Sequence, residues 1–195
     1  MLEQYLINHC APTLASLKTA NLFNCTAENP TALQMAVSRW QALLAPKGVE
    51  LLLLRENGNR ALVYVYRPDR LARDLQQPGV AAFLAHCGYT GTAPAACLEV
   101  LRRKLAVSSD FPHEIGLFLG YPLGDVIGFI ENHGQNCLCS GVWKVYTNPE
   151  AAAGAFRKFS KCTRVYRRLF FGGQRNVEQL TVKICLLYTS PRPRD

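Results

Sequence analysis

The chain has 195 residues, a formal net charge of +8 and an apolar content of 49%. This length is sufficient for a domain with a substantial core, and no stretch approaches the ~20 uncharged apolar residues that a membrane-spanning helix needs. The first residues, MLEQYLINHCAPTL, also lack the basic and apolar regions of a secretory signal. We therefore expect a cytoplasmic protein that has no membrane partner.

The first part of the chain is predicted to be helical. Helical tendency covers Leu2–Phe23, with a break at Ala11-Pro12. Asn29-Pro30 then supplies an N-cap and a proline at the first helical position, which predicts a second helix that ends at Pro46-Lys47-Gly48.

A β-hairpin is predicted next. Val49–Arg55 and Ala61–Arg67 are rich in strand-forming residues and flank Asn57-Gly58, a pair that tolerates the positive φ of tight hairpin turns. Two strands joined by such a turn must be antiparallel.

The rest of the chain alternates short helices with strands. The predicted helices are Asp69–Gln76, Gly79–Cys87, Pro94–Val107, Pro112–Gly120, Pro122–His133 and a long one from Pro149 to Phe171. The predicted strands are 141–147 and 177–184. Together with hairpin 49–67, this pattern predicts an α+β fold, in which a small, largely antiparallel sheet is covered by several helices.

The last eleven residues, Cys185–Asp195, read CLLYTSPRPRD, and we interpret them as a translated sequencing adapter. Their first six residues back-translate to TGT CTC TTA TAC ACA TCT, which is similar to the transposase end used to build sequencing libraries. Such a segment is excluded from fold reasoning. We therefore predict a single domain over residues 1–184, truncated at its C-terminus, and we treat 185–195 as foreign to the natural protein.

His113-Glu114 and Cys10 are the candidate catalytic residues. Leu117 occupies the place of the second histidine of an HExxH zinc site, so the pair instead suggests a general acid and base that face a cleft. The alternative is that Glu114 lies in the first turn of a helix and stabilises its N-terminus. No base near Cys10 in the sequence supports a nucleophile there, which favours a buried cysteine.

Cysteine and histidine residues offer an alternative metal site. Seven cysteines precede the tail, an odd number, and the chain has no export signal, so we expect no disulfide framework. His133, Cys137, Cys139 and Cys162 could supply four ligands, but a Cys-x-Cys pair lacks the spacing of a structural zinc knuckle. We therefore expect no bound metal.

Positive charge is concentrated on the predicted helix 149–171. Residues 1–150 contain 12 basic and 12 acidic residues, whereas 151–184 contain eight basic residues and one acid, Glu178. Arg157, Lys161, Arg164 and Arg168 form one stripe along the helix. The stripe could contact a nucleic-acid backbone, or it could be a solvated face.

Two blocks of sequence together resemble an uncharacterised bacterial family, domain of unknown function 3793. The blocks are Cys10–Phe23 and His113–Phe129, and the second continues through Trp143–Tyr146 and Lys161–Thr163. The resemblance implies a cytoplasmic, stand-alone protein of this size without assigned catalytic residues. It also implies a link to redox or iron metabolism.

Three hypotheses follow, and the sequence does not decide whether the protein is an enzyme. The first is a small cytosolic binding or accessory protein for a small molecule or a protein partner. The second is an enzyme or a thiol or metal protein that uses His113 with Cys10 or Cys139, and the third is a nucleic-acid binder through helix 149–171. No segment resembles a flavin or nicotinamide loop, so we expect no cofactor. The ligand-binding residues of the first hypothesis are Thr13, Lys18, His113, Tyr121 and Lys144.

Overall fold

The computed structural model has the predicted α+β fold. It describes residues 2–107 and 111–183, so the predicted foreign tail 185–195 and the last residue of the predicted strand 177–184 lie outside the described residues. In the described part of the chain, no helix combines the length and the apolar character needed to cross a bilayer. The elements in chain order are α1 (Leu2–Leu14), β1 (Ala20–Thr26), α2 (Pro30–Leu44), the short 3-10 helix η1 (Ala45–Lys47), β2 (Glu50–Asn57), β3 (Arg60–Tyr66), α3 (Pro68–Leu75), α4 (Val80–His86), α5 (Pro94–Val107), α6 (Ile115–Phe118), α7 (Leu123–Glu131), β4 (Cys139–Ser140), β5 (Lys144–Val145), α8 (Pro149–Phe171) and α9 (Val177–Leu180).

The main sheet is antiparallel, with strand order β1-β3-β2. Asn57 pairs with Arg60, so Gly58 and Asn59 form a two-residue turn between β2 and β3. Gly58 adopts a φ of +59°, the left-handed conformation that this turn needs. The predicted hairpin is confirmed.

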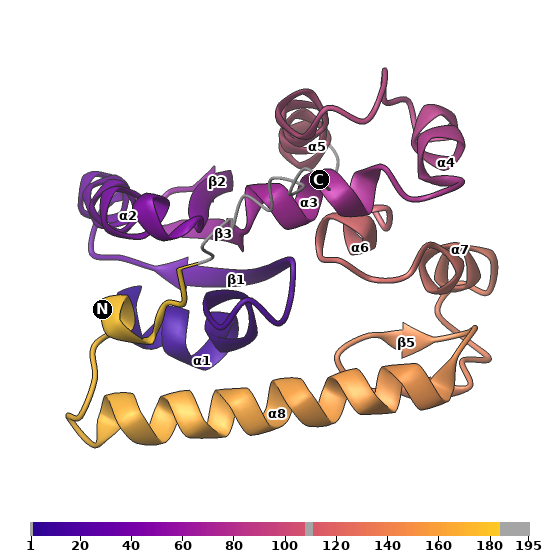
Figure 1. The fold of residues 1–195 in the computed structure, drawn as a ribbon. Coiled ribbons are helices and arrows are strands. Elements are labelled where there is room, and N and C mark those ends of the chain that lie inside the picture. Colours follow the sequence, from indigo (N-terminus) through magenta and orange to yellow (C-terminus); the bar gives the residue numbers. More distant parts are fainter. Residues whose placement is uncertain (1, 108–110, 184–195) are drawn as a thin grey trace, which may run out of the picture.

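Both faces of this sheet are covered, because the central strand β3 is buried from Ala61 to Tyr66. Ala61, Val63 and Val65 belong to a core cluster with α1, α2 and α9. Leu62, Tyr64 and Tyr66 point to the opposite face and belong to a second cluster with α3, α5 and α6. In Figure 1 the sheet accordingly lies between α1, with α8 beyond it, and the helices α3 and α5.

The helical interpretation of Leu2–Phe23 is wrong in its second half. Helix α1 continues through Pro12 to Leu14, and the chain turns at Ser16, which has a φ of +58°. The following residues form β1, which pairs with β3 from Ala20–Tyr66 to Thr26–Arg60. This pairing covers one edge of β3, a long-range contact that local helical tendency does not reveal.

The predicted strand 141–147 is also corrected. Only Lys144–Val145 forms a strand, and it pairs with Cys139–Ser140 in a separate two-stranded sheet. The ladder stops there because the backbone N–H groups of Tyr146 and Thr147 donate to the Asp125 carboxylate, at 2.8 and 2.9 Å, and not to another strand.

The predicted strand 177–184 begins as the short helix α9. The Asn176 side chain accepts from the Gln179 N–H, and the Gln179 side chain accepts from the Asn176 N–H, so the two residues form a capping box. This reciprocal cap outweighs the strand tendency of the segment. Asn29 and Asn148 cap α2 and α8 as the sequence predicts, by accepting from the N–H groups of Ala32 and Ala151.

The buried guanidinium of Arg67 joins three parts of the chain. Arg67 follows β3 and has no exposed surface. It donates to the carbonyls of Thr13 and Leu14 at 2.7 Å and to the Val182 carbonyl at 2.9 Å. The end of α1 and the segment after α9 are therefore both fixed to the end of β3.

We predict that Arg67→Met lowers the free energy of unfolding by about 3–5 kcal/mol, because each carbonyl left without a donor costs about 1–3 kcal/mol. Arg67→Lys should show a smaller loss, since one ammonium cannot reproduce the planar fork. Urea unfolding at pH 7 measures both changes. Arg39→Met, at an exposed position of α2, is the control and should change stability by less than about 0.5 kcal/mol. A loss below about 1 kcal/mol for Arg67→Met would contradict this role.

Candidate functional site

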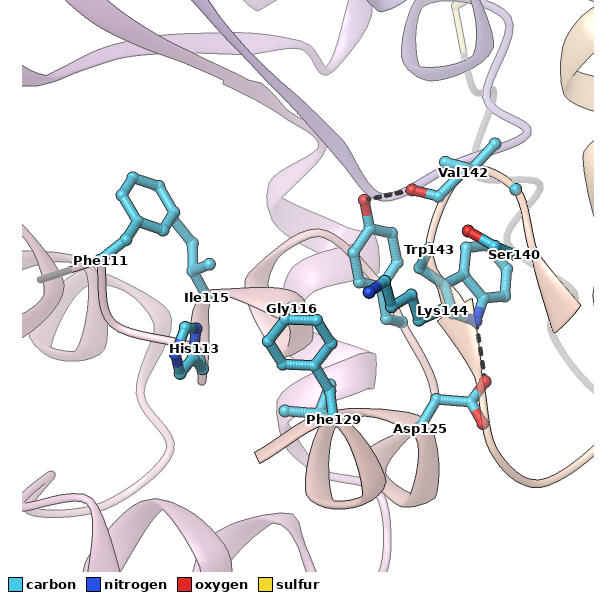
Figure 2. Close-up of a pocket in the computed structure, with 13 residues that line it drawn as sticks. Phe111, His113, Ile115, Gly116, Asp125, Phe129, Ser140, Val142, Trp143 and Lys144 are labelled. Atoms are coloured by element: carbon cyan, nitrogen blue, oxygen red, sulfur yellow. Dashed lines mark hydrogen bonds between the residues drawn. The ribbon is translucent and has the colours of Figure 1, made fainter. Parts of the chain in front are cut away.

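A cavity of about 350 Å³ lies where α6 and α7 meet the loop that joins β4 to β5. Figure 2 shows Phe111 and His113 at one end, Trp143 and Ser140 at the other, and Phe129 between them. The lining residues are Phe111, His113, Ile115, Gly116, Tyr121, Asp125, Val126, Phe129, Ser140, Gly141, Val142, Trp143 and Lys144.

The Asp125 carboxylate holds the two sides of this cavity together. It lies in the first turn of α7 and is 3% exposed. It accepts from Trp143 Nε1 at 2.7 Å, from the N–H groups of Tyr146 and Thr147, and from Thr147 Oγ1 at 2.8 Å. Burial opposes the charge of Asp125, but these hydrogen bonds outweigh burial and lower its pKa.

Two glycines of α7 allow the chain after β5 to approach closely. A Cβ at Gly124 would lie 2.6 Å from Thr147 Cγ2, and a Cβ at Gly128 would lie 2.5 Å from Tyr146 Cγ. Larger side chains at these positions would push Tyr146 and Thr147 away from Asp125. The two glycines therefore leave room for the hydrogen bonds from Trp143, Tyr146 and Thr147 to Asp125, which we call the Asp125 clamp.

Aromatic rings form most of the cavity wall. Tyr121 and Trp143 stack with centroids 5.0 Å apart, and the edge of Phe156 supports Trp143 from outside at 4.6 Å. His113 and Phe129 meet in an edge-on arrangement at 5.1 Å. The cavity thus presents flat apolar surfaces, with the polar edge of His113 at one end.

Lys144 gives the cavity its positive charge. Its Nζ donates to the Gly134 carbonyl at 2.5 Å and lies 5.9 Å from the centroid of Phe129. Among the described lining residues Asp125 is the only carboxylate, and its oxygens already accept four hydrogen bonds. These bonds do not cancel the charge of Asp125, but they direct its oxygens to protein donors, so that Lys144 is the charged group with donors left for a ligand.

The family described as Protein of unknown function (DUF3793) matches residues 6–181 of the chain. The chain belongs to this family. The resemblance inferred from the sequence is thereby confirmed. No curated protein and no solved structure matches the chain. The range that matches DUF3793 includes every residue that lines the cavity.

The five ligand-binding residues predicted for this DUF3793 protein are only partly brought together. His113, Tyr121 and Lys144 line the cavity. Lys18 lies behind its wall, with Nζ 5.0 Å from the centroid of Tyr121. Thr13 is buried and donates to Asn21 Oδ1 at 2.7 Å, and it does not line the cavity.

Lys18 is an unusual buried cation. The residue is 4% exposed, and its ammonium donates to the Ala20 carbonyl. Burial lowers the pKa of Lys18 to about 7, an effect that the nearby Cys10 partly opposes. Lys18 also lines a second hollow, formed with α8, as do Arg164 and Arg167.

The candidate catalytic residues do not form one reactive group. Glu114 points away from His113 to an ion pair with Lys104 at 2.5 Å and accepts from Tyr89 Oη at 3.2 Å, so its carboxylate is engaged in the core beside α5. Cys10 is fully buried, and burial raises its pKa, so its thiol stays protonated at neutral pH. Glu114 lies at the N-cap of α6, before the first turn in which the sequence placed it, and its side chain makes no cap hydrogen bond.

The alternative metal ligands are not assembled. Among the described residues, no group of three or more His, Cys, Asp or Glu side chains is placed to hold a metal ion. Cys162 is buried in α8 and contacts the Ala11 carbonyl at 3.5 Å, whereas His133 is exposed in the turn after α7. Cys137 and Cys139 are half-buried near β4. The predicted basic stripe of Arg157, Lys161, Arg164 and Arg168 is exposed along α8.

Sequence reasoning missed the aromatic walls and the clamp. Asp125 and Phe129 both lie in α7, but Trp143 comes from the loop between β4 and β5, so no local pattern joins the three residues. A possible signal was the pairing of an isolated acid at a helix start with a later Trp that needs a partner for its indole N–H.

We predict that Asp125→Asn lowers the free energy of unfolding by about 2–3 kcal/mol at pH 7, because an amide cannot accept all four hydrogen bonds. Asp69→Asn is the matched control. Asp69 is an exposed first-turn acid of α3, so its loss should be below about 1 kcal/mol. The folded pKa of Asp125 is lowered, so its contribution is present above about pH 4 and is lost as the pH falls through the folded pKa. Urea unfolding at pH 7 and pH 3 should therefore show the difference between wild type and Asp125→Asn becoming smaller; a constant difference would count against the clamp.

We predict that Lys18→Met raises the free energy of unfolding by about 1–2 kcal/mol at pH 6, because it removes a buried ammonium without a carboxylate partner. The pKa of Lys18 is lower in the native state than in the unfolded chain, so between pH 7 and about pH 10 only the unfolded chain binds this proton. The free energy of unfolding of wild type should therefore rise as the pH increases over this range. The advantage of Lys18→Met should therefore decrease over this range in thermal unfolding. Lys158→Met, at an exposed position of α8, should show no such trend. A marked loss of stability in Lys18→Met would mean that the ammonium stabilises the fold.

Proposed function

We propose that this protein is a binding or accessory protein whose cavity takes a small, planar ligand with a negative charge. The observation that carries the proposal is the convergence of aromatic walls and the Lys144 ammonium on one cavity. The site lies between segments that the Asp125 clamp fixes, so it is available without a large rearrangement.

The size and surface of the cavity support a small ring system. Its volume of about 350 Å³ falls at the lower end of the ~300–1,000 Å³ typical of ligand sites. Tyr121, Phe129 and Trp143 offer ring faces and edges, against which a flat ligand gains more than area burial alone.

The charge of the cavity supports an anionic group on that ligand. Lys144 supplies an ammonium, and His113 adds a ring nitrogen near the opposite end. The Asp125 carboxylate is 3% exposed and its oxygens are occupied by Trp143, Tyr146 and Thr147, so an anionic group would be placed toward Lys144. A carboxylate or sulfonate on the ligand would pair with Lys144.

Binding is favoured over catalysis because the cavity lacks a paired nucleophile and base among its lining residues. His113 contacts the Phe129 ring, Asp125 serves the clamp, and Glu114 pairs with Lys104. A role in redox or iron metabolism, and a cytoplasmic location, remain predictions from the family resemblance.

We predict that 8-anilino-1-naphthalenesulfonate, an aromatic sulfonate, binds one site, and that Lys144→Gln weakens binding about tenfold through loss of the ion pair. The neutral dye N-phenyl-1-naphthylamine should bind wild type and Lys144→Gln equally, whereas Phe129→Ala should weaken both dyes. Energy transfer from Trp143 to the dye measures binding, with Trp40→Phe removing the other tryptophan.

The control is Lys158→Gln, which removes an exposed cation that does not line the cavity. All variants are first compared in thermal unfolding, so that dye uptake by loosened protein is recognised. If Lys144→Gln and Phe129→Ala bind the sulfonate as wild type does, the cavity is not the site and the proposal is wrong.

A further inference from the structure

A second hollow, of about 670 Å³, lies between the α1–β1 segment and α8. It shares Gly141 and Val142 with the aromatic cavity, so that this stretch of chain separates the two spaces. We propose that this basic groove is a separate binding site for a small phosphate monoester, whose phosphate meets Lys18, Arg164 and Arg167. This inference concerns other residues and does not depend on the proposed function of the aromatic cavity.

The charge of the groove lining is entirely positive. Lys18, Arg164 and Arg167 line it together with His9, and no Asp or Glu is among the lining residues. The ion pairs found in the described residues, Arg102–Glu99 and Lys104–Glu114, involve none of these cations. An anion that entered the groove would therefore not displace an internal salt bridge.

Lys18 is the buried member of the three cations that line the groove. Its ammonium has a carbonyl and the Tyr121 ring as neighbours but no carboxylate contact, although the side chain is almost fully buried. A buried cation is costly unless an anion accompanies it, so the fold retains a charge that a bound phosphate would compensate. The lowered pKa of Lys18 agrees with an ammonium that lacks its counter-charge.

The remaining lining suits a phosphate that is attached to an apolar group. Ser160 and Thr163 add hydroxyl groups from the same face of α8 as Arg164 and Arg167. Phe156, Phe159 and Val142 form an apolar surface beside them. Phosphate oxygens accept readily from guanidinium and hydroxyl groups, and the apolar surface can cover the organic part of the ester.

A small ester fits this arrangement better than a nucleic acid does. A polymer backbone would follow the exposed stripe of α8, including Arg157, Lys161 and Arg168, which do not line the groove. It would gain nothing from Lys18, which is buried at the inner end. A terminal phosphate can enter the groove and reach Lys18.

The test is calorimetric titration with n-butyl phosphate, a non-planar ester that the aromatic cavity is not expected to take, with n-butanol as the uncharged comparison. We expect one site for n-butyl phosphate and no measurable binding of n-butanol. Lys18→Met and the double variant Arg164→Gln/Arg167→Gln should each weaken binding at least tenfold. The control Arg157→Gln/Arg168→Gln removes the same charge from the same helix outside the groove, and should leave the affinity within twofold.

The pH dependence tests Lys18 directly. Between pH 7 and pH 9 the phosphate is largely a dianion, and the groups that face Lys18 do not titrate, because burial raises the pKa of Cys10 and raises that of Tyr121 to about 12. Burial lowers the pKa of His9, which is therefore neutral throughout. Affinity of wild type should fall over this range as Lys18 loses its proton, and the fall should be absent in Lys18→Met.

Three results would overturn the inference. They are no binding of n-butyl phosphate, equal weakening by the groove and control double variants, and tighter binding of a single-stranded DNA 20-mer with strong salt dependence that both double variants reduce equally. The last two would assign the charge of α8 to unspecific or nucleic-acid binding. Phe129→Ala should bind n-butyl phosphate as wild type does, which separates this site from the aromatic cavity.

Discussion

The fold depends on the buried guanidinium of Arg67, whose hydrogen bonds to backbone carbonyls hold distant segments of the chain together. Arg67 has no exposed surface, yet its N–H groups find carbonyls at the end of α1 and after α9, parts of the chain that no strand ladder connects. Burial lowers the pKa of Arg67 to about 10, which leaves it charged at neutral pH. A charged donor that satisfies several carbonyls at once fixes where α1 ends, and therefore where β1 begins.

The aromatic cavity also depends on one buried charged side chain that binds several groups, in this case a carboxylate. Asp125 accepts hydrogen bonds from an indole N–H, two backbone N–H groups and a hydroxyl. These donors belong to residues that follow Asp125 by 18 to 22 positions in the chain. Figure 2 shows the result, with Trp143 held beside the Asp125 carboxylate. A carboxylate satisfied in this way is poorly suited to act as a base, but it joins the two sides of the cavity and leaves Lys144 as the charged group with donors for a ligand.

The two hollows meet at a thin wall. Tyr121 faces the aromatic cavity, donates to the Val142 carbonyl at 3.3 Å and lies under the Lys18 ammonium, which lines the basic groove. A change in the charge of Lys18 therefore acts on the ring that stacks against Trp143. This contact gives the two spaces a direct physical connection.

The sequence by itself determined the features that depend on neighbouring residues. The hairpin of β2 and β3 around Gly58, the Asn-Pro starts of α2 and α8, the α+β class and the family all follow from local patterns. Tertiary structure decided what depends on distant partners. Ala20–Thr26 became a strand because β3 has an edge to cover, and the predicted strand 141–147 shortened because Asp125 takes its N–H groups. His113, Tyr121 and Lys144 were identifiable as unexplained polar residues, but only packing joined them with Phe129 and Trp143, because an aromatic wall is assembled across the fold and leaves no periodic pattern in the chain.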